Sequence, residues 1–292
     1  MRHLQGGGGA CSFMRSRNEM LNAEIVQYMC GAGGWRGESR IADLGGGAGH
    51  DASRVSAETG ATVLCVDLVA KSAWKAHCGN PLFVVGDALC LPLKSGSLDA
   101  VFMACLYHLV DDKEWLLSES YRSLIPEGNL FIVTVSEAHL RDRFLNRYFP
   151  SIEHSDLKRY GTIAGLNELA QSAGFQSVDI KSVVLREEMP TDEFFAVIKK
   201  KSWSSLRRIC AEEYREGLRR LETDSRRWSG MRMPSWLNWR TVVWLRKVGA
   251  PLRAPSAEGT SVGGARAGDG HGPTEGSADV RGRQGAQQPG RL

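Results

Sequence analysis

A glycine-rich run behind an acidic residue is the part of this sequence best suited to chemistry. Gly45, Gly47 and Gly49 alternate with other residues, and Asp43 lies two positions before the first of them. Glycine lets the backbone turn tightly and approach a bound molecule closely. The run lacks the Gly-Lys-Ser/Thr of a phosphate-binding loop, and His50 occupies the position where a dinucleotide fingerprint has Gly or Ala. Asp43 therefore favours a cationic ligand over a pyrophosphate.

Two more carboxylates follow short apolar runs. Asp67 ends the run that starts at Ala61, and Asp87 ends the run that starts at Leu82. If both runs are parallel strands, these side chains lie at the carboxyl edge of the sheet, where ligands of doubly wound folds bind. One carboxylate can accept hydrogen bonds from two donors, so each of these side chains could orient a polar ligand.

Six ordered segments between Arg40 and Val135 together resemble the class I S-adenosylmethionine-dependent methyltransferases, in their type 11-like, small-molecule branch. They are the acidic glycine run, Asp67, Gly86-Asp87-Ala88, the Leu91-Pro92-Leu93 and Ser97–Val101 pair, Ala104–Asp111, and Arg122–Leu130. The resemblance implies S-adenosyl-L-methionine as cofactor, with Asp67 on the ribose hydroxyls and Asp87 near the adenine amino group. The predicted cofactor-binding residues are Asp43, Gly45, Gly47, Gly49, Asp67, Leu68, Asp87, Ala88 and Cys105. We predict no metal ligands.

His108 is the candidate catalytic residue. An ordinary histidine titrates near neutrality, so it can act as a general base if the acceptor is a hydroxyl or a protonated amine. The alternative is a histidine that orders the loop or packs against the substrate. The segment departs from the family pattern because Tyr107-His108 replaces a His-His pair. The sequence leaves both roles open.

We expect the acceptor pocket to come from two segments. One is an N-terminal helix around Asn18–Cys30, and the other is His139–His154, which follows the fifth predicted strand. The second segment is rich in arginine and aromatic residues. Arginine can bind a carboxylate or phosphate through two parallel hydrogen bonds. A solvated amphipathic helix is the alternative interpretation of the same segment. The resemblance implies methylation of a small molecule in metabolite or natural-product biosynthesis.

Apolar strands alternate with helices along the chain, which predicts an α/β fold with a Rossmann-like, doubly wound sheet. The first six expected strands are Arg40–Leu44, Ala61–Val66, Leu82–Val85, Leu98–Ala104, Asn129–Val135 and Ser177–Val184. The expected helices are His50–Thr59, Val69–His77, Asp112–Ile125, Thr162–Ala173, one that Thr191 caps, and Ser204–Leu221. We predict a turn at Pro126–Asn129. Arg240–Lys247 is predicted to be the seventh strand, antiparallel to Ser177–Val184, and a terminal helix over Pro234–Val248 is the alternative.

The expected organisation has three parts: a cap segment over residues 1–36, a methyltransferase domain over 37–248, and a disordered, glycine-rich tail over 249–292. The domain contains a core over 40–135 and a helical insertion over 190–235 between strands six and seven. Seven cysteines without a Cys-x-x-Cys pair favour reduced thiols and a cytoplasmic location. No apolar run is long enough to span a membrane.

The charge distribution leaves alternatives to a small-molecule enzyme. The chain has a net charge of +4, and residues 199–247 contain 14 basic and 5 acidic side chains. Such a segment could dock RNA or a protein substrate, although we see no RNA-binding module and do not expect nucleic acid as a partner. A non-catalytic S-adenosylmethionine-binding protein is a further alternative, and His50 disfavours a nucleotide-dependent oxidoreductase. The sequence does not indicate the oligomeric state.

Overall fold

The fold is described from a computed structural model of the chain. The structure describes residues 21–72, 74, 80–187, 191–226 and 236–248. All of the described residues belong to one compact unit. The predicted tail lies outside the described residues, and so do residues 73 and 75–77 of the helix predicted over Val69–His77. Residues 69–71 of that predicted helix are described and are not helical.

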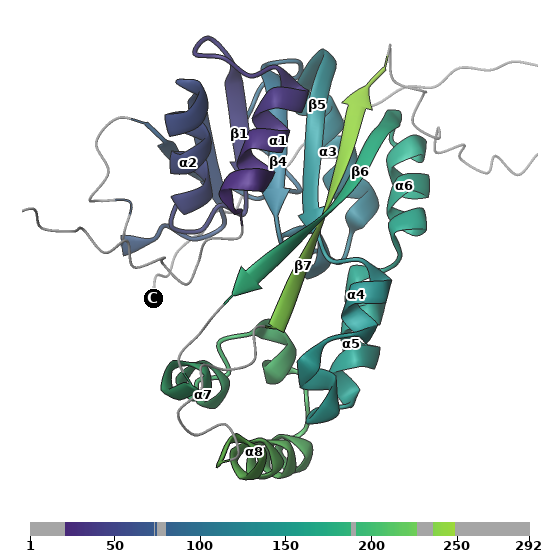
Figure 1. The fold of residues 1–292 in the computed structure, drawn as a ribbon. Coiled ribbons are helices and arrows are strands. Elements are labelled where there is room, and N and C mark those ends of the chain that lie inside the picture. The colour runs from purple at the N-terminus through teal and green to yellow at the C-terminus, as the bar shows by residue number, and fades with distance from the viewer. Residues whose placement is uncertain (1–20, 73, 75–79, 188–190, 227–235, 249–292) are drawn as a thin grey trace, which may run out of the picture. The chain divides into compact units, whose positions relative to one another are not determined.

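Seven strands form one mixed sheet in the order β3-β2-β1-β4-β5-β7-β6 (Figure 1). Their bounds are β1 Arg40–Leu44, β2 Thr62–Asp67, β3 Leu82–Val85, β4 Leu98–Ala104, β5 Leu124–Thr134, β6 Phe175–Glu187 and β7 Trp236–Lys247. The first five pair in parallel, whereas β7 is antiparallel to both β5 and β6. The predicted doubly wound sheet with an antiparallel last strand is therefore confirmed, and the alternative of a terminal helix is wrong for the described part of Pro234–Val248.

Helices cover both faces of the sheet, which explains why the central strands are mostly apolar. On one face α1 (Ala23–Gly33) and α2 (His50–Thr59) pack on side chains such as Ile41 and Phe102. On the other face α3 (Lys113–Ser123) and α6 (Ile163–Ser172) pack on side chains such as Leu44 and Met103. Burial on both faces leaves the carboxyl ends of the strands as the place where polar residues can gather.

A third group of short helices lies beyond those carboxyl ends (Figure 1). The connection from β5 to β6 contributes α4 (Glu137–Arg141), the 3-10 helix η3 (Phe144–Arg147) and α5 (Ser151–Tyr160). The insertion between β6 and β7 contributes α7 (Thr191–Lys199), the 3-10 helix η4 (Ser204–Arg207) and α8 (Ala211–Ser225). These two connections share a small apolar core, which contains Phe149, Ile152, Phe194, Leu206 and Leu221.

Two predicted elements differ from the structure. The single helix expected over Ser204–Leu221 is wrong, because the chain forms η4 and then starts α8 after Cys210, whose backbone is extended and whose Sγ accepts a hydrogen bond from the amide of Glu213. The turn expected at Pro126–Asn129 is also wrong, because β5 continues through it as an irregular strand. The β4–β5 register shifts there, and Glu127 has a φ of 63°.

No helix in the described ranges combines the length and the apolar character that a bilayer-spanning helix needs.

Two helical glycines provide a matched test of this packing. A Cβ at Gly31 in α1 would meet nothing within 4 Å, whereas a Cβ at Gly217 in α8 would overlap the Phe149 ring and the carbonyl oxygen of Tyr148. We expect Gly31→Ala to stabilise the protein by about 0.5–1 kcal/mol, since alanine is the better helix former. We expect Gly217→Ala to destabilise it by about 1–3 kcal/mol, as overpacking does. Urea unfolding measures both, and equal effects would contradict the packing of α8 on Phe149.

Candidate active site

The glycine run forms one wall of a cavity at the carboxyl end of β1. The cavity measures about 610 Å³ and is lined by Asp43, Gly45, Gly46, Gly47, Ala48, His50, Asp51, Lys71, Ser72, Ala104, Cys105 and Leu109. Because the loop crosses from β1 to α2, its glycines bring the backbone directly against this space. Gly46 has no room for a side chain, since a Cβ there would lie 2.5 Å from both Asp43 Oδ2 and Cys65 Sγ.

Asp43 is the buried carboxylate of this cavity. Its side chain is 1% exposed, and Oδ2 has no hydrogen-bond partner among the residues described. The pKa of Asp43 is raised well above its usual range by burial and by the nearby charge of Asp51, although a hydrogen bond from the amide of Ala52 opposes this shift. A buried acceptor atom without a donor is costly. The site therefore suits a ligand that brings a cation or a hydrogen-bond donor to Asp43.

Asp67 and Asp87 lie at the carboxyl ends of neighbouring strands. Asp67 Oδ2 accepts a hydrogen bond from the amide of Gly47 at 3.0 Å, and Oδ1 lies 3.2 Å from Lys71 Nζ. Asp87 is exposed, and its Oδ1 accepts a hydrogen bond from the amide of Leu89 at 2.9 Å. Asp67 thus holds the glycine loop in place. Each carboxylate keeps lone pairs that these contacts do not use.

The cavity includes some of the predicted cofactor-binding residues and not others. Asp43, Gly45, Gly47 and Cys105 line it. Gly49 instead caps the start of α2 with a left-handed φ of 84°. Asp67, Leu68, Asp87 and Ala88 lie outside the cavity lining, at the ends of β2 and β3. Their contact with a cofactor stays a prediction.

A second cavity adjoins the first at Cys105 and Leu109, which line both. Cys105 directly follows β4 and has a φ of 58°, a left-handed conformation that residues other than glycine rarely adopt. Burial raises the pKa of its thiol. Strained backbone of this kind is often found where a chain positions groups at a functional site.

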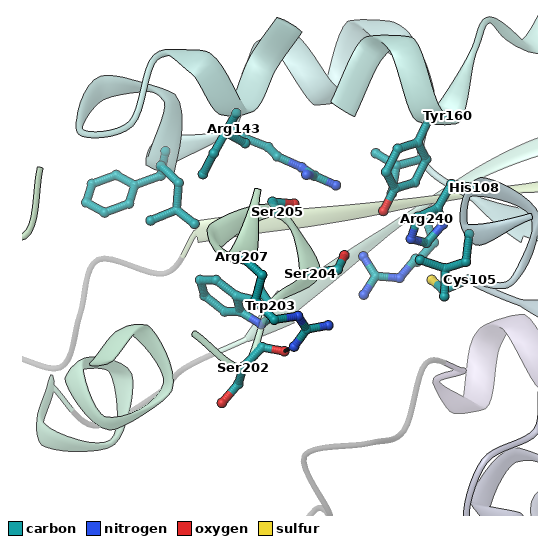
Figure 2. A pocket seen from close by; sticks show the side chains of 15 residues that line it. Cys105, His108, Arg143, Tyr160, Ser202, Trp203, Ser204, Ser205, Arg207 and Arg240 are labelled. Carbon is teal, nitrogen blue, oxygen red and sulfur yellow. Dashed lines mark hydrogen bonds between the residues drawn. The ribbon is translucent and has the colours of Figure 1, made fainter. Parts of the chain in front are cut away.

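The second cavity measures about 350 Å³ and lies beneath the two helical connections (Figure 2). Its wall comes from the loop after β4, the β5–β6 connection, the insertion and β7. The lining residues are Cys105, His108, Leu109, Val135, Arg143, Phe144, Leu145, Ile152, Tyr160, Ser202, Trp203, Ser204, Ser205, Arg207 and Arg240. None of these described residues is acidic, so arginine sets the charge of the cavity.

His108 lies in this wall within the short 3-10 helix η2 (Tyr107–Leu109). Its ring stacks on Tyr160 with the centroids 4.0 Å apart, and its Nδ1 has no hydrogen-bond partner in the described part of the chain. Burial, with the charges of Arg159 and Arg143, lowers the pKa of His108 to about 3. A neutral imidazole with so low a pKa is a weak proton acceptor. These contacts favour the packing alternative over the general base.

A buried carboxylate fixes the arginines around the second cavity. Asp156 in α5 is 1% exposed and binds Arg143 and Arg159, each with an N–O distance of 2.5 Å. Asp156 Oδ2 also accepts a hydrogen bond from Ser205 Oγ at 2.7 Å. The guanidinium groups of Arg143 and Arg159 both lie over the Tyr160 ring, at 5.6 and 5.5 Å. Asp156 therefore links the β5–β6 connection to the insertion.

Of the two segments predicted to form the acceptor pocket, only His139–His154 contributes described residues to the second cavity. From His139–His154, the residues Arg143, Phe144, Leu145 and Ile152 line the second cavity. Tyr148 and Phe149 belong to the small helical core instead. The N-terminal segment is not part of either wall: in its described range, residues 21–30, no side chain lines a cavity, and α1 packs against α2 and the sheet.

Sequence reasoning missed several residues of the second cavity. Ser204, Ser205 and Arg207 come from η4, Trp203 directly precedes η4, and Arg240 comes from β7. The excess of basic residues over 199–247 was the available signal, although it did not separate these arginines from those on the helix surface. Arg219 of α8, for example, pairs with Glu216 at 2.8 Å on the exposed face.

Comparison with protein families agrees with this geometry. The family described as "Methyltransferase domain" matches residues 42–132, which run from β1 to β5 and include the glycine loop. The chain therefore contains a methyltransferase domain of the class I, S-adenosylmethionine-dependent type.

Two curated proteins are similar to part of the chain. A malonyl-[acyl-carrier protein] O-methyltransferase of Methylococcus capsulatus is 26% identical over 160 residues, which cover 52% of this chain and 58% of that protein. An arsenite methyltransferase of Aquipseudomonas alcaligenes is 27% identical over 188 residues, which cover 54% of this chain and 52% of that protein. The chain thus spans about half the length of these relatives.

Solved structures share the fold at low sequence identity. A protein of Anabaena variabilis, provisionally assigned as a methyltransferase of an antibiotic biosynthesis pathway, has a TM-score of 0.57 at 17% identity, covering 77% of this chain and 97% of that one. A protein of Bacillus halodurans, also provisionally assigned as a methyltransferase, has a TM-score of 0.53 at 15% identity, covering 77% of this chain and all of that one.

Asp156 provides a test of how the second cavity is held together. We expect Asp156→Asn to destabilise the protein by about 3–5 kcal/mol, because it leaves Arg143 and Arg159 with an uncompensated buried charge. Glu153→Gln in the same helix is the matched control. It removes an exposed ion pair with Arg141 and should cost less than about 1 kcal/mol. Urea unfolding monitored by tryptophan fluorescence compares the two, and similar losses would contradict the role of Asp156.

Proposed function

We propose that this protein is an S-adenosylmethionine-dependent methyltransferase that acts on a small-molecule acceptor. The observation that carries the proposal is the junction of two cavities at Cys105 and Leu109, one beside the glycine loop and the other beneath the helical connections. Two bound molecules can meet at this junction. A non-catalytic cofactor-binding protein would not need the second cavity.

The glycine-loop cavity fits the cofactor. S-adenosylmethionine supplies a methyl group that its positively charged sulfur makes electrophilic. Asp43 would accept a hydrogen bond from a cationic group of the cofactor, which gives its unpartnered Oδ2 a donor. Asp67 would hold the ribose hydroxyls and Asp87 would lie near the adenine, while Gly45 and Gly47 let the backbone approach. Asp43 and Asp51 line this cavity, and Asp43 becomes negatively charged when it releases its proton to bind a cationic cofactor.

The second cavity fits a small acceptor. Its volume of about 350 Å³ lies at the lower end of the range for small-molecule pockets. Positioning of the acceptor in line with the methyl group can contribute roughly 7–11 kcal/mol to catalysis. The curated relatives are named for a malonyl carrier protein and for arsenite. Because those acceptors differ, the lining of the second cavity is the better guide to the acceptor of this protein.

The alternative, a methyltransferase that docks RNA or a protein through the basic segment over 199–247, has less support. Arg207 and Arg240 line the second cavity, Lys199 pairs with Glu222 at 3.0 Å, and Arg219 pairs with Glu216. These four basic residues, all in the described part of the segment, are therefore divided between a cavity and local ion pairs.

Cofactor binding should be linked to proton release at Asp43. The pKa of Asp43 in the free protein is raised, and a cationic ligand favours its ionised form. Binding therefore releases a proton, so the affinity for S-adenosylmethionine should rise with pH until the pH exceeds that raised pKa. Isothermal titration calorimetry in buffers of different ionisation enthalpy measures the released proton.

Asp43→Asn should weaken cofactor binding about tenfold or more and remove the proton release. Glu58→Gln, an exposed change in the neighbouring helix α2, is the control and should leave both unchanged. Binding of NAD in place of S-adenosylmethionine, or proton release that persists in Asp43→Asn, would count against the proposed function.

His108→Ala should lower turnover about tenfold or more while cofactor affinity barely changes, because His108 lines the acceptor cavity and not the glycine-loop cavity. The measurement is labelled-methyl transfer into a metabolite extract, with calorimetry of S-adenosylmethionine as the second readout. His154→Ala is a matched control, since that histidine is exposed in α5 outside the cavity lining. Unchanged turnover in His108→Ala would remove the residue from the mechanism.

A further inference from the structure

The two adjoining cavities differ in the charged residues that line them. Asp43 and Asp51 line the cavity of the glycine loop together with Lys71, whose Nζ lies 3.2 Å from Asp67 Oδ1. Arg143, Arg207 and Arg240 point into the second cavity from three separate segments (Figure 2). Among the residues described, no Asp or Glu lines that second cavity. A cationic molecule is therefore favoured on one side of Cys105 and an anionic molecule on the other.

The arginines keep positive charge in the second cavity. Asp156 is a single carboxylate that binds two guanidinium groups, those of Arg143 and Arg159, so one of the two charges is left over. Arg207 Nη1 donates to the carbonyl oxygens of Lys201 and Ser202 at 3.2 and 3.3 Å. Neutral carbonyl oxygens orient this side chain without cancelling its charge. Guanidinium groups arranged in this way suit an oxyanion such as a carboxylate.

Apolar side chains make up the rest of the second cavity. Phe144 and Ile152 come from the β5–β6 connection, Val135 follows β5, and Trp203 comes from the insertion. These residues offer packing surface and no charge. The cavity thus matches a molecule that has one anionic end and an apolar body.

The side chains near the junction are poor general bases. His108 faces Arg159, Asp156, Arg143 and Lys113, and burial with these charges lowers its pKa to about 3. Burial raises the pKa of Cys105 and the pKa of Tyr160, so both stay protonated near neutral pH. An acceptor that is already ionised needs no base, whereas a hydroxyl acceptor does.

We propose, on the basis of the methyltransferase function above, that the acceptor is a small organic carboxylate with an apolar body. Its carboxylate lies among Arg143, Arg207 and Arg240, and that carboxylate itself takes the methyl group. An oxygen lone pair forms the new O–CH₃ bond while the C–S bond breaks and its electron pair stays on sulfur. The carboxylate and the sulfonium become a neutral ester and a neutral thioether. No proton moves in this step.

Binding to the full chain tests the charge requirement without relying on turnover. In the presence of S-adenosylhomocysteine, calorimetry compares a panel of aliphatic and arylalkyl monocarboxylates, including octanoate and 3-phenylpropanoate, with their primary amides. We expect the carboxylates to bind about tenfold or more tightly than the amides, since a charge-assisted hydrogen bond is lost in the amide. Equal binding, or no binding by any carboxylate of the panel, would overturn the proposal. Tighter binding of octyl phosphate than of octanoate would also overturn it.

Arg207 and Arg208 are a matched pair of variants. Both are exposed, but only Arg207 lines the cavity. Arg207→Gln should weaken carboxylate binding about fivefold or more and leave amide binding unchanged, whereas Arg208→Gln should change neither. Two variants of Arg240 extend the test to the buried end of the cavity. Arg240→Lys keeps the charge, and Arg240→Gln removes it. Melting temperatures identify any variant that is unfolded. Equal effects of Arg207→Gln and Arg208→Gln would contradict the proposal.

The product distinguishes this inference from the function on which it rests. With S-adenosylmethionine and a bound carboxylate, mass spectrometry should detect the methyl ester. A methyl group on any other atom of the acceptor would overturn the inference and leave the methyltransferase function standing. Failure of S-adenosylmethionine and S-adenosylhomocysteine to bind at all would instead refute the proposed function.

Discussion

A single buried carboxylate determines how the second cavity of this protein is built. Asp156 pairs with the guanidinium groups of Arg143 and Arg159 and accepts a hydrogen bond from the Ser205 hydroxyl of the insertion. Buried ions are costly unless they are paired, so the three segments are held in one arrangement. The His108 ring stacks on Tyr160, which lies at the end of the same helix. The wall of the second cavity follows from this pairing.

The cofactor side depends on a different constraint, the close approach of the backbone after β1. Gly46 lies against Asp43 and Cys65 without room for a side chain, and Asp67 holds the amide of Gly47. Asp43 is left with a buried oxygen that has no donor in the described residues. The protein thus holds a carboxylate ready on one side of Cys105 and guanidinium groups on the other.

The fold and the cofactor loop could be predicted from the sequence because their signals are local. Apolar strands buried on both faces, as Ala42 and Val101 illustrate, leave an unbroken pattern in the chain. A loop residue with positive φ is likewise visible in the sequence because glycine is favoured there, as at Gly45 and Gly47.

The second cavity could not be predicted in the same way, because tertiary contacts assemble it. Arg143 and Ser205 meet only through Asp156, and Arg240 reaches the cavity from a strand that pairs with residues more than 100 positions earlier in the chain. The break before α8 was missed for a related reason, since Cys210 is an uncommon helix cap. An arginine that lines a cavity and an arginine on a helix surface look the same in a sequence.

The long pairing of β6 with β7 has a consequence for how such a protein can change. The two strands are paired from Phe175 with Lys247 to Glu187 with Trp236, and everything between them in the chain is the insertion. Because the hairpin fixes both ends of that segment, a different insertion can be placed there without altering β1, β2 or the glycine loop. Evolution, or an engineer, can therefore exchange the part of the second-cavity wall that the insertion supplies, such as Trp203 and Arg207, while the glycine loop stays unchanged.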